Sequence, residues 1–317
     1  MSLLDYTNPV WAGYLADPFV LKWQGEWFAY GTGEEPYRGG NAFPTLRSTD
    51  FAHWEPQGCA LTPVAGVKSY WAPEVAARDG RFFLFYSGAG AAGDEAHRLR
   101  VAVADHPLGP FADSGRLLLP DEGFTIDAHP FRDPRDGRWY LFFSKDYFDA
   151  RAGTAIAAAP LADDMLSLDG PITTILRPSA DWQISARNRA LYGRRWDAWH
   201  TVEGAHVAFH EGRYFLFYSG GAWTGEGYGV GYAVADAALG PYTEPEAGPV
   251  VLRGVPGHVI GPGHHSVVLG PGDRTPYFVY HAWDTAHTAR RMCLDRLAWT
   301  ADGPRCAGPT WTPQAVG

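Results

Sequence analysis

The sequence has 317 residues, of which 46% are hydrophobic and 15% aromatic, so a large core can be buried and intrinsic disorder is excluded. Its 38 glycines and 25 prolines argue against long helices and favour an all-β fold. The formal net charge of −9, without a cluster of Lys and Arg, argues against nucleic acid and anionic membranes as partners.

The first residues, MSLLDYTNPVW, contain neither a basic segment nor the apolar run of a signal peptide. No apolar run elsewhere approaches the roughly 20 residues that a membrane span needs. We therefore expect a cytoplasmic protein. Cys59, Cys293 and Cys306 are an odd count without CxxC spacing, which favours isolated, reduced thiols.

A turn followed by aromatic and aliphatic residues recurs along the chain. Three close copies are DGRFFLFYS at 79–87, DGRWYLFFS at 136–144 and EGRYFLFYS at 211–219; looser copies lie at 24–32 and at 277–281. The repeat glycines, spaced 55 to 75 residues apart, are Gly25, Gly80, Gly137, Gly212 and Gly272. Each copy predicts a hairpin turn that leads into a buried strand.

A second recurring segment predicts the next strand of each unit. RVAVAD at 100–105 and GYAVAD at 231–236 each lead to a Gly-Pro-aromatic sequence, and AIAAA at 155–159 takes the corresponding place in the third copy. Five units of three or four strands predict a five-bladed β-propeller, a single domain over residues 1–317. Residues 179–200, polar and Trp-rich, lie in the longest interval and are expected to be an inserted loop.

Each unit carries an ionisable residue six to ten positions before its repeat glycine, on the strand that a blade presents to the central channel. These residues are Asp17, Glu74, Asp127, Glu203 and His264. Because the units repeat, we expect the five side chains at nearly equivalent positions around one axis. Glu74 is the least secure member, since its Trp-Ala-Pro context also suits packing. Buried charges are costly unless they are paired or functional, so the ring indicates a functional site.

Three carboxylates around one pocket suit the hydrolysis of glycosidic bonds. One acid protonates the leaving oxygen, while a base activates water or a nucleophile attacks. A third acid can raise the pKa of the proton donor through its like charge. The many Trp and Tyr side chains offer faces on which sugars can stack.

Two other kinds of site are disfavoured. The glycine-rich segment 225–229 does not precede a predicted helix, which argues against a dinucleotide site. His258, His264 and His265 lack HExxH spacing, and the two adjacent histidines would point to opposite faces of a strand, which argues against a three-histidine zinc site.

With these motifs the sequence resembles family 43 of the glycoside hydrolases, from Asn8 to Gly303. Ala16-Asp17-Pro18 resembles the family's base motif. Val202-Glu203-Gly204 resembles its acid motif, although the family often has Pro where Ala205 stands. Ile126-Asp127-Ala128, with Phe131 and Asp136-Gly137, resembles the segment of the third acid, which modulates the donor's pKa and orients it. Each motif alone is weak, but their order along the chain is specific.

The resemblance implies further site residues. Gly263-His264 resembles the motif of an axial histidine that binds calcium, or a monovalent cation, largely through waters; we expect calcium at His264. Arg290 resembles the arginine that reaches the terminal sugar, with Arg291 as the alternative register. Trp71 is a candidate stacking platform on the pocket wall.

The resemblance implies a propeller that cleaves arabinose- and xylose-containing glycosides with inversion. We expect an α-L-arabinofuranosidase or β-xylosidase that releases the terminal pentose from short oligosaccharides. The motive is the 179–200 segment, which with Trp182, Trp196 and Trp199 can close one end of a groove. That segment could instead pack on the outer face or at a subunit interface. An endo-1,5-α-L-arabinanase with an open groove and a carbohydrate-binding propeller without catalysis are the alternatives. The oligomeric state stays open.

Overall fold

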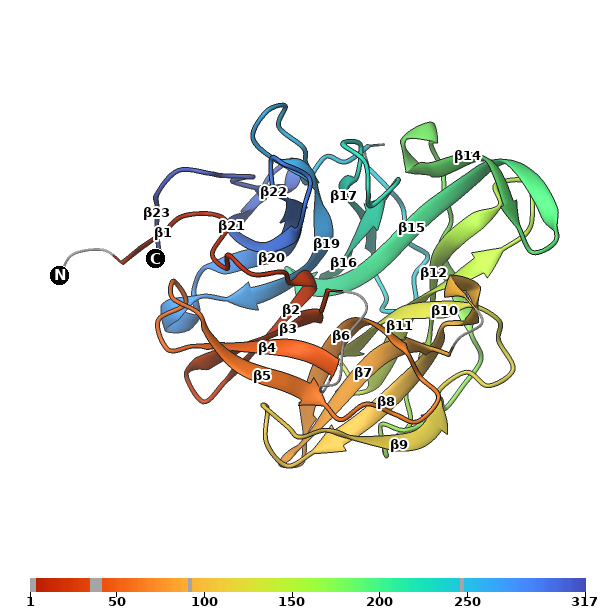
Figure 1. The fold of residues 1–317 in the computed structure, drawn as a ribbon, viewed down its shortest axis with the longest axis horizontal. Coiled ribbons are helices and arrows are strands. Elements are labelled where there is room, and N and C mark those ends of the chain that lie inside the picture. The colour runs from red at the N-terminus through yellow and green to blue at the C-terminus, as the bar shows by residue number, and fades with distance from the viewer. Residues whose placement is uncertain (1–3, 35–41, 91–92, 246–247) are drawn as a thin grey trace.

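The computed structural model describes residues 4–34, 42–90, 93–245 and 248–317, and its regular structure is almost entirely β (Figure 1). Short 3-10 helices occur at η1 (Asp94–Ala96), η2 (Asp181–Gln183) and η3 (Pro271–Asp273). Within the described ranges, no helix has the length and apolar character needed to cross a membrane.

The strands of the described residues form five consecutive antiparallel units of four strands each. The first unit contains β2 (Ala16–Trp23), β3 (Glu26–Thr32), β4 (Ala42–Ser48) and β5 (Glu55–Leu61). The second contains β6 (Ser69–Arg78), β7 (Arg81–Ala89), β8 (Arg98–Ala104) and β9 (Ala112–Leu117). The third contains β10 (Thr125–Arg132), β11 (Trp139–Tyr147), β12 (Gly153–Pro160) and β13 (Thr173–Leu176).

The fourth unit contains β15 (Arg194–His210), β16 (Arg213–Gly220), β17 (Gly229–Ala235) and β18 (Leu252–Arg253). The fifth contains β19 (Ile260–Leu269), β20 (Pro276–Trp283), β21 (Arg290–Thr300) and β22 (Gly303–Cys306). Near the termini, β1 (Asp5–Tyr6) pairs with β23 (Gln314–Ala315). The all-β propeller that the repeats predict is confirmed, and the recurring aromatic segments form the second strand of each unit.

The repeat glycines make the turns between the first two strands. In the first, second and fourth units the turn has two residues, Gln24-Gly25, Asp79-Gly80 and Glu211-Gly212, and both φ angles are positive in each. Such turns match the twist of the strands that they join, and glycine reaches this conformation without steric cost. The hairpins predicted from Asp-Gly and Glu-Gly are therefore present.

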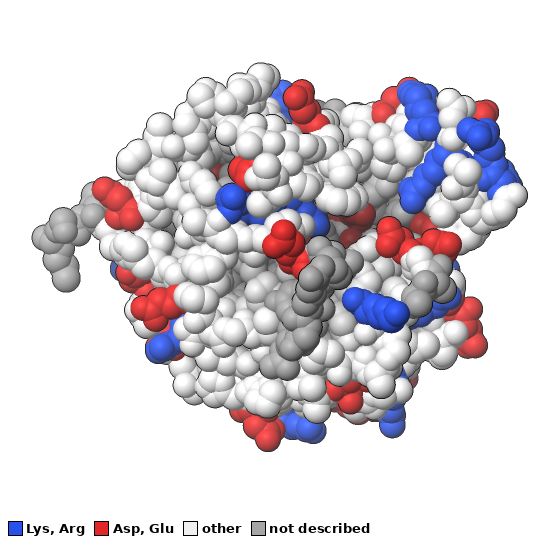
Figure 2. All heavy atoms as spheres, viewed as in Figure 1, with Lys and Arg blue, Asp and Glu red and all other residues white. Residues whose placement is uncertain are grey.

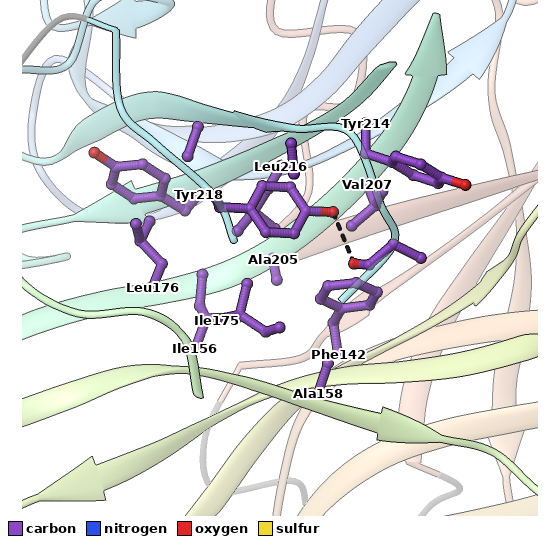
Figure 3. Close-up of a cluster of buried hydrophobic side chains, with 14 of the residues drawn as sticks. Phe142, Ile156, Ala158, Ile175, Leu176, Ala205, Val207, Tyr214, Leu216 and Tyr218 are labelled. Carbon is purple, nitrogen blue, oxygen red and sulfur yellow. Dashed lines mark hydrogen bonds between the residues drawn. The ribbon is translucent and has the colours of Figure 1, made fainter. Parts of the chain in front are cut away.

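The hydrophobic core lies between neighbouring units. In Figure 3, Phe142 and Ile156 of the third unit pack against Val207 and Leu216 of the fourth. A cluster that holds Val20 of the first unit and Leu294 of the fifth closes the ring. Each such side chain, when fully buried, contributes about 1.5–3 kcal/mol relative to exposure. The units are thus held together by shared apolar surface.

A β-bulge interrupts the first strand of every unit. The register shifts fall between Ala16 and Phe19, Trp71 and Glu74, Ile126 and His129, Glu203 and His206, and Gly263 and Ser266. The first residue inside each bulge has a positive φ: Asp17 (49°), Ala72 (46°), Asp127 (58°), Gly204 (59°) and His264 (44°). For a residue other than glycine this conformation costs about 1–2 kcal/mol.

The bulges correct the expectation that five ionisable residues occupy equivalent positions. Asp17, Asp127 and His264 are equivalent, because each is the first residue inside its bulge. Glu203 stands one residue before that position, and Glu74 stands two residues after it. A bulge inserts an extra residue and re-aims the side chains around it. Glu203 still lines one pocket with Asp17 and Asp127, whereas Glu74 does not.

The segment 179–200 is not an irregular loop. It forms η2, the strand β14 (Ile184–Leu191) and the start of β15, and β14 and β15 pair as a hairpin. Beyond the hairpin, Gly153 and Thr154 of β12 pair in parallel with His200 and Thr201 of β15, which joins the third and fourth units. A Cβ atom at Gly153 would lie 2.0 Å from the carbonyl oxygen of His200, so only glycine permits this approach.

Candidate active site

A pocket of about 390 Å³ is bordered by the bulges of the units. Its lining contains all six residues expected in the site: Asp17, Trp71, Asp127, Glu203, His264 and Arg290. Glu74 does not line it. A wider cleft of about 1000 Å³ lies between the fourth and fifth units, and its lining contains none of the six residues expected in the site.

Polar side chains on the second strands hold the bulges in place. The hydroxyl oxygens of Thr32, Ser87 and Ser219 accept the N–H groups of Ala72, Asp127 and His264 in the following unit, at 2.9, 3.1 and 2.8 Å. At the closure of the ring, Nδ1 of His281 lies 3.1 Å from the N–H of Asp17. At the remaining junction, Oδ2 of Asp127 accepts the N–H of Gly204 (3.1 Å). The strained backbone beneath the pocket is thus braced by neighbouring units.

Asp17 is surrounded by groups that stabilise its charge. Oδ1 lies 3.0 Å from Nη1 of Arg290 and 3.4 Å from Nδ1 of His264, and Oδ2 accepts the Thr32 hydroxyl at 2.6 Å. Burial alone would raise the pKa of Asp17, but Arg290, His264 and His281 outweigh it and hold the pKa well below its usual value. Asp17 is therefore ionised over the whole neutral range.

Glu203 has the opposite electrostatic setting. Its pKa is raised to about 7, chiefly by burial and further by the charge of Asp17. A hydrogen bond from Tyr228 lowers the pKa and offsets part of this rise. The Tyr228 hydroxyl donates to Oε1 at 2.8 Å. A carboxyl group with this pKa keeps its proton for a substantial fraction of the time near neutrality, so it can act as an acid.

Asp127 lies beside Glu203 through the backbone of Gly204. Burial raises the pKa of Asp127 well above its usual value, and the charges of Glu203 and Asp17 raise it further. When two buried carboxyl groups lie close together, the charge of one raises the pKa of the other, and the two titrate as a pair. Asp127 and Glu203 therefore lose their protons at higher pH than isolated carboxyl groups do, whereas Asp17 is already ionised.

Of the two candidate arginines, the pocket contains Arg290. Arg290 bonds Asp17 and the Tyr14 hydroxyl (3.1 Å), and its guanidinium lies 4.4 Å from the ring centre of Trp223. Arg291 pairs with Asp284 (3.0 Å) and bonds the carbonyl oxygen of Ala12, outside the pocket lining. Arg290 therefore faces the pocket, and the alternative register, with Arg291 in its place, is not the one adopted.

Trp71 and His264 both border the pocket. The Trp71 ring stacks on His97, with ring centres 3.5 Å apart, so at most one face is open to a ligand. Burial lowers the pKa of His264, so its ring is neutral and offers one nitrogen lone pair. Among the described residues, His264 belongs to no group of three close metal-ligating side chains. A cation at His264 would therefore be held largely by waters.

Deeper in the channel, Glu74 and the histidines His129 and His206 bring three ligand atoms within 4.8 Å of one another. Nε2 of His129 and of His206 accept the N–H groups of Val207 (3.0 Å) and Val267 (3.2 Å), so in the neutral rings the protons are on Nδ1. The His129 Nδ1–H donates to Glu74 at 2.7 Å. A metal would have to displace both Nδ1 protons, whereas metal-bound histidines donate with their second nitrogen. The cluster does not fit a metal.

Sequence reasoning missed several residues of the pocket. Tyr228 lies in the glycine-rich segment 225–229, which was considered only as a dinucleotide motif. A Cβ atom at Gly263 would lie 2.4 Å from the Tyr228 ring, so the glycine before His264 makes room for it. Asp146 also lines the pocket and accepts hydroxyl groups from Tyr192 (2.6 Å) and Thr154 (2.8 Å). The glycines around these aromatic residues were the available signal.

Comparison with known proteins adds an independent finding. The model of glycosyl hydrolases family 43 matches residues 6–304. A β-D-galactofuranosidase of Aspergillus niger is 26% identical over 316 residues, covering 93% of this chain and 83% of the relative. An extracellular exo-α-(1→5)-L-arabinofuranosidase of Streptomyces avermitilis is 24% identical, covering 95% of this chain and 62% of the relative. The crystal structure of a thermostable family-43 glycoside hydrolase superimposes with a TM-score of 0.85 at 30% identity, covering 98% of both chains.

Proposed function

The chain belongs to family 43 of the glycosyl hydrolases, inverting enzymes that act on glycosidic bonds, and from this premise we propose that it releases a terminal pentose from short arabinose- or xylose-containing oligosaccharides. Asp17 is the general base, Glu203 the general acid, and Asp127 the carboxyl group that modulates the pKa of the acid. The assignment is carried by two carboxyl groups that line one pocket and whose pKa values are shifted in opposite directions, that of Asp17 downward and that of Glu203 upward.

The charge states suit an inverting displacement. The ionised Asp17 accepts a proton from the attacking water, while the protonated Glu203 donates its proton to the leaving oxygen. The charge of an ionised Glu203 raises the pKa of Asp127, so the two neighbouring carboxyl groups do not lose their protons independently, which supports the role of Asp127 as a modulator. Arg290, whose guanidinium donors are fixed by Asp17 and Tyr14, is placed to bond sugar hydroxyls as well.

The β14–β15 hairpin supports an exo mode of action. Ser185, Leu191, Tyr192 and Trp199 of this hairpin line the pocket, so the insertion borders the site rather than the outer face. Trp196 is buried behind Trp199. A wall on this side leaves less room for a polymer to run through than an open groove would. Relatives that are 24–25% identical include probable endo-1,5-α-L-arabinosidases, so endo action is the alternative to be tested.

Two assays test the function. The first measures hydrolysis of p-nitrophenyl α-L-arabinofuranoside, β-D-xyloside and β-D-galactofuranoside, the last because of the Aspergillus niger relative. The second analyses early products from linear arabino- and xylo-oligosaccharides and from debranched arabinan. Monosaccharide alone from the first minutes supports the proposal; early di- and trisaccharides mean an endo enzyme.

We also propose that His264 binds a hydrated cation, calcium being favoured because it accepts waters and tolerates irregular coordination. The support is the neutral ring of His264 at the pocket beside the Asp17 carboxylate. Such an ion would add positive charge close to the base. Exhaustive chelation should lower kcat, and calcium should restore it, in the wild-type protein but not in His264→Ala. Unchanged activity after chelation would show that no cation is needed.

A further inference from the structure

The proposed acid assigns the two sides of the pocket to different parts of the substrate. A general acid stands next to the leaving oxygen, so the wall that carries Glu203 faces the leaving group. Trp199, Thr201 and Glu203 are alternate residues of β15, and all three line the pocket. Side chains at alternate positions of a strand share a face. The hairpin that precedes Glu203 on the same strand therefore lies on the side of the leaving group.

This hairpin carries an unusual charge for the molecule. Four arginines, Arg187, Arg189, Arg194 and Arg195, lie within nine residues of a chain whose net charge is −9. Figure 2 shows Lys and Arg side chains gathered over the end of the molecule where Figure 1 places β14. None of these four arginines takes part in the ion pairs found among the described residues, although neighbours such as Arg151 and Arg177 do. The hairpin therefore carries a local cluster of arginines, contrary to the expectation that the sequence contains none.

Arg189 is the member of the cluster that lines the pocket. It is partly buried, and its guanidinium lies 5.6 Å from the ring centre of Trp199. Its positive charge is close enough to lower the pKa of Tyr192 and of Asp146. Burial nevertheless raises the pKa of Asp146, the largest effect on that carboxyl group. Arg189 thus presents a guanidinium to the pocket, near enough to Asp146 to act on its pKa but in none of the ion pairs within 4.0 Å that the described residues form.

Contacts of Tyr192 hold the hairpin against the third unit. The Tyr192 hydroxyl donates to Asp146 on β11 at 2.6 Å, and the Tyr192 ring meets Phe148 edge to face at 5.1 Å. A subsite on a braced hairpin keeps its geometry when a ligand binds. Asp94 and Glu95 also line the pocket, but both are exposed, and solvent screens their charges more than that of a partly buried group.

We propose that the β14–β15 hairpin forms the subsite for the leaving group, and that Arg189 binds a carboxylate carried by that group. The preferred substrates are then acidic saccharides, such as pentosides attached to a uronic acid or to a chain that bears one. A guanidinium matches a carboxylate with two parallel hydrogen bonds, which a neutral sugar cannot offer. This inference rests on the proposed assignment of Glu203 as the acid and deepens it.

Two glycosides whose leaving groups have nearly the same shape but differ in charge test the inference, with the Arg189→Gln variant as the reference for their different leaving ability. Their leaving groups are 4-hydroxybenzoate and 4-hydroxybenzamide, which are nearly isosteric, and their sugar is the pentose that the enzyme cleaves best. The quantity measured is the ratio of kcat/KM for the carboxylate to that for the carboxamide. For the wild type we expect a ratio of roughly ten to a hundred at low salt, as for a hydrogen bond to a charged group. The ratio should fall as salt screens the charges.

Three variants locate the effect. Arg189→Gln should remove the preference for the carboxylate, so that only the intrinsic difference between the two leaving groups is left. Arg195 lies on the same hairpin but outside the pocket lining, so Arg195→Gln should keep most of the preference. Glu95→Gln should increase it by removing a like charge. Because the ratio is measured within each variant, a partly unfolded preparation does not change it.

The outcomes separate this inference from the proposed function. A wild-type ratio of one or less, or a ratio that Arg189→Gln leaves unchanged, overturns the acidic subsite alone. If neither glycoside is hydrolysed, the proposed release of pentose fails and the inference falls with it. A preference lost equally in Arg189→Gln and Arg195→Gln would also overturn it, because it would show a general field rather than a contact at Arg189.

Discussion

The Tyr228 hydroxyl donates a hydrogen bond of 2.8 Å to Oε1 of Glu203. The Tyr228 ring stacks on the ring of His281, with ring centres 6.0 Å apart. Nδ1 of His281 in turn lies 3.3 Å from Oδ1 of Asp17. One buried tyrosine therefore contacts the proposed acid directly and the proposed base through one histidine. The hydrogen bond favours the ionised form of Glu203, so it lowers a pKa that burial raises. Tyr228 is a positioning residue for the acid.

Tyr228→Phe should move the basic limb of the kcat/KM profile to higher pH. The acid must be protonated to work, and the limb lies at its pKa, which is about 7 in the intact pocket. Loss of a hydrogen bond to the ionised form raises that pKa, by roughly one pH unit. A pH profile of the variant beside the wild type measures the change. A lower rate with an unmoved limb would mean a purely structural role for the hydroxyl.

The loss of activity on replacing Glu203 should depend on the leaving group of the substrate, whereas the loss on replacing Asp17 should not. Glu203→Ala should lose roughly 10²–10⁴-fold in kcat on oligosaccharides but much less on aryl glycosides with good leaving groups, which need little protonation. Asp17→Ala should lose activity on both, because water still needs a base. Equal losses for both variants on both substrate types would contradict the assignment.

Arg290→Gln should move the acidic limb of the profile to higher pH. Burial favours the neutral form of Asp17, and Arg290 is the largest influence that opposes it, so the pKa of Asp17 rises when the guanidinium is lost. A base must be ionised to work, and it then loses activity at a higher pH than in the wild type. Arg291→Gln is the control, because Arg291 bonds outside the pocket. An acidic limb that stays in place in Arg290→Gln would contradict the argument.

Gly153→Ala should destabilise the fold far more than Gly193→Ala. The new Cβ at residue 153 would lie 2.0 Å from the His200 carbonyl oxygen, which forces apart the contact between β12 and β15. We expect a loss of roughly 2–5 kcal/mol in the free energy of unfolding. At Gly193, in the β14–β15 turn, φ is also positive but no atom lies within 4 Å, so only about 1–2 kcal/mol of backbone strain is expected. Urea midpoints compare the two, and equal midpoints would refute the close approach.

The sequence did not reveal the positions of the channel residues in their strands. Counting back from the repeat glycines placed Glu74 and Glu203 in one ring with Asp17. The bulges give the two glutamates different positions in their strands, because each bulge adds a residue to one strand only, and Glu203 lines the pocket whereas Glu74 does not. Nothing in the composition of Trp71-Ala72-Pro73 distinguishes a bulge from a regular strand. Glu74 therefore faces His129, and the pocket takes Trp71 from that unit.

By itself, the sequence determined the repeat, the all-β propeller and the family, because a hairpin turn and a buried strand depend on neighbours in the chain that recur in each copy. Only the tertiary structure decided that Arg290 rather than Arg291 meets Asp17, 273 residues away, and that the insertion becomes a hairpin whose Arg189 borders the pocket. The charge states of Asp17 and Glu203 were decided there too. A pKa depends on burial and on charges brought from distant strands, and local sequence encodes neither.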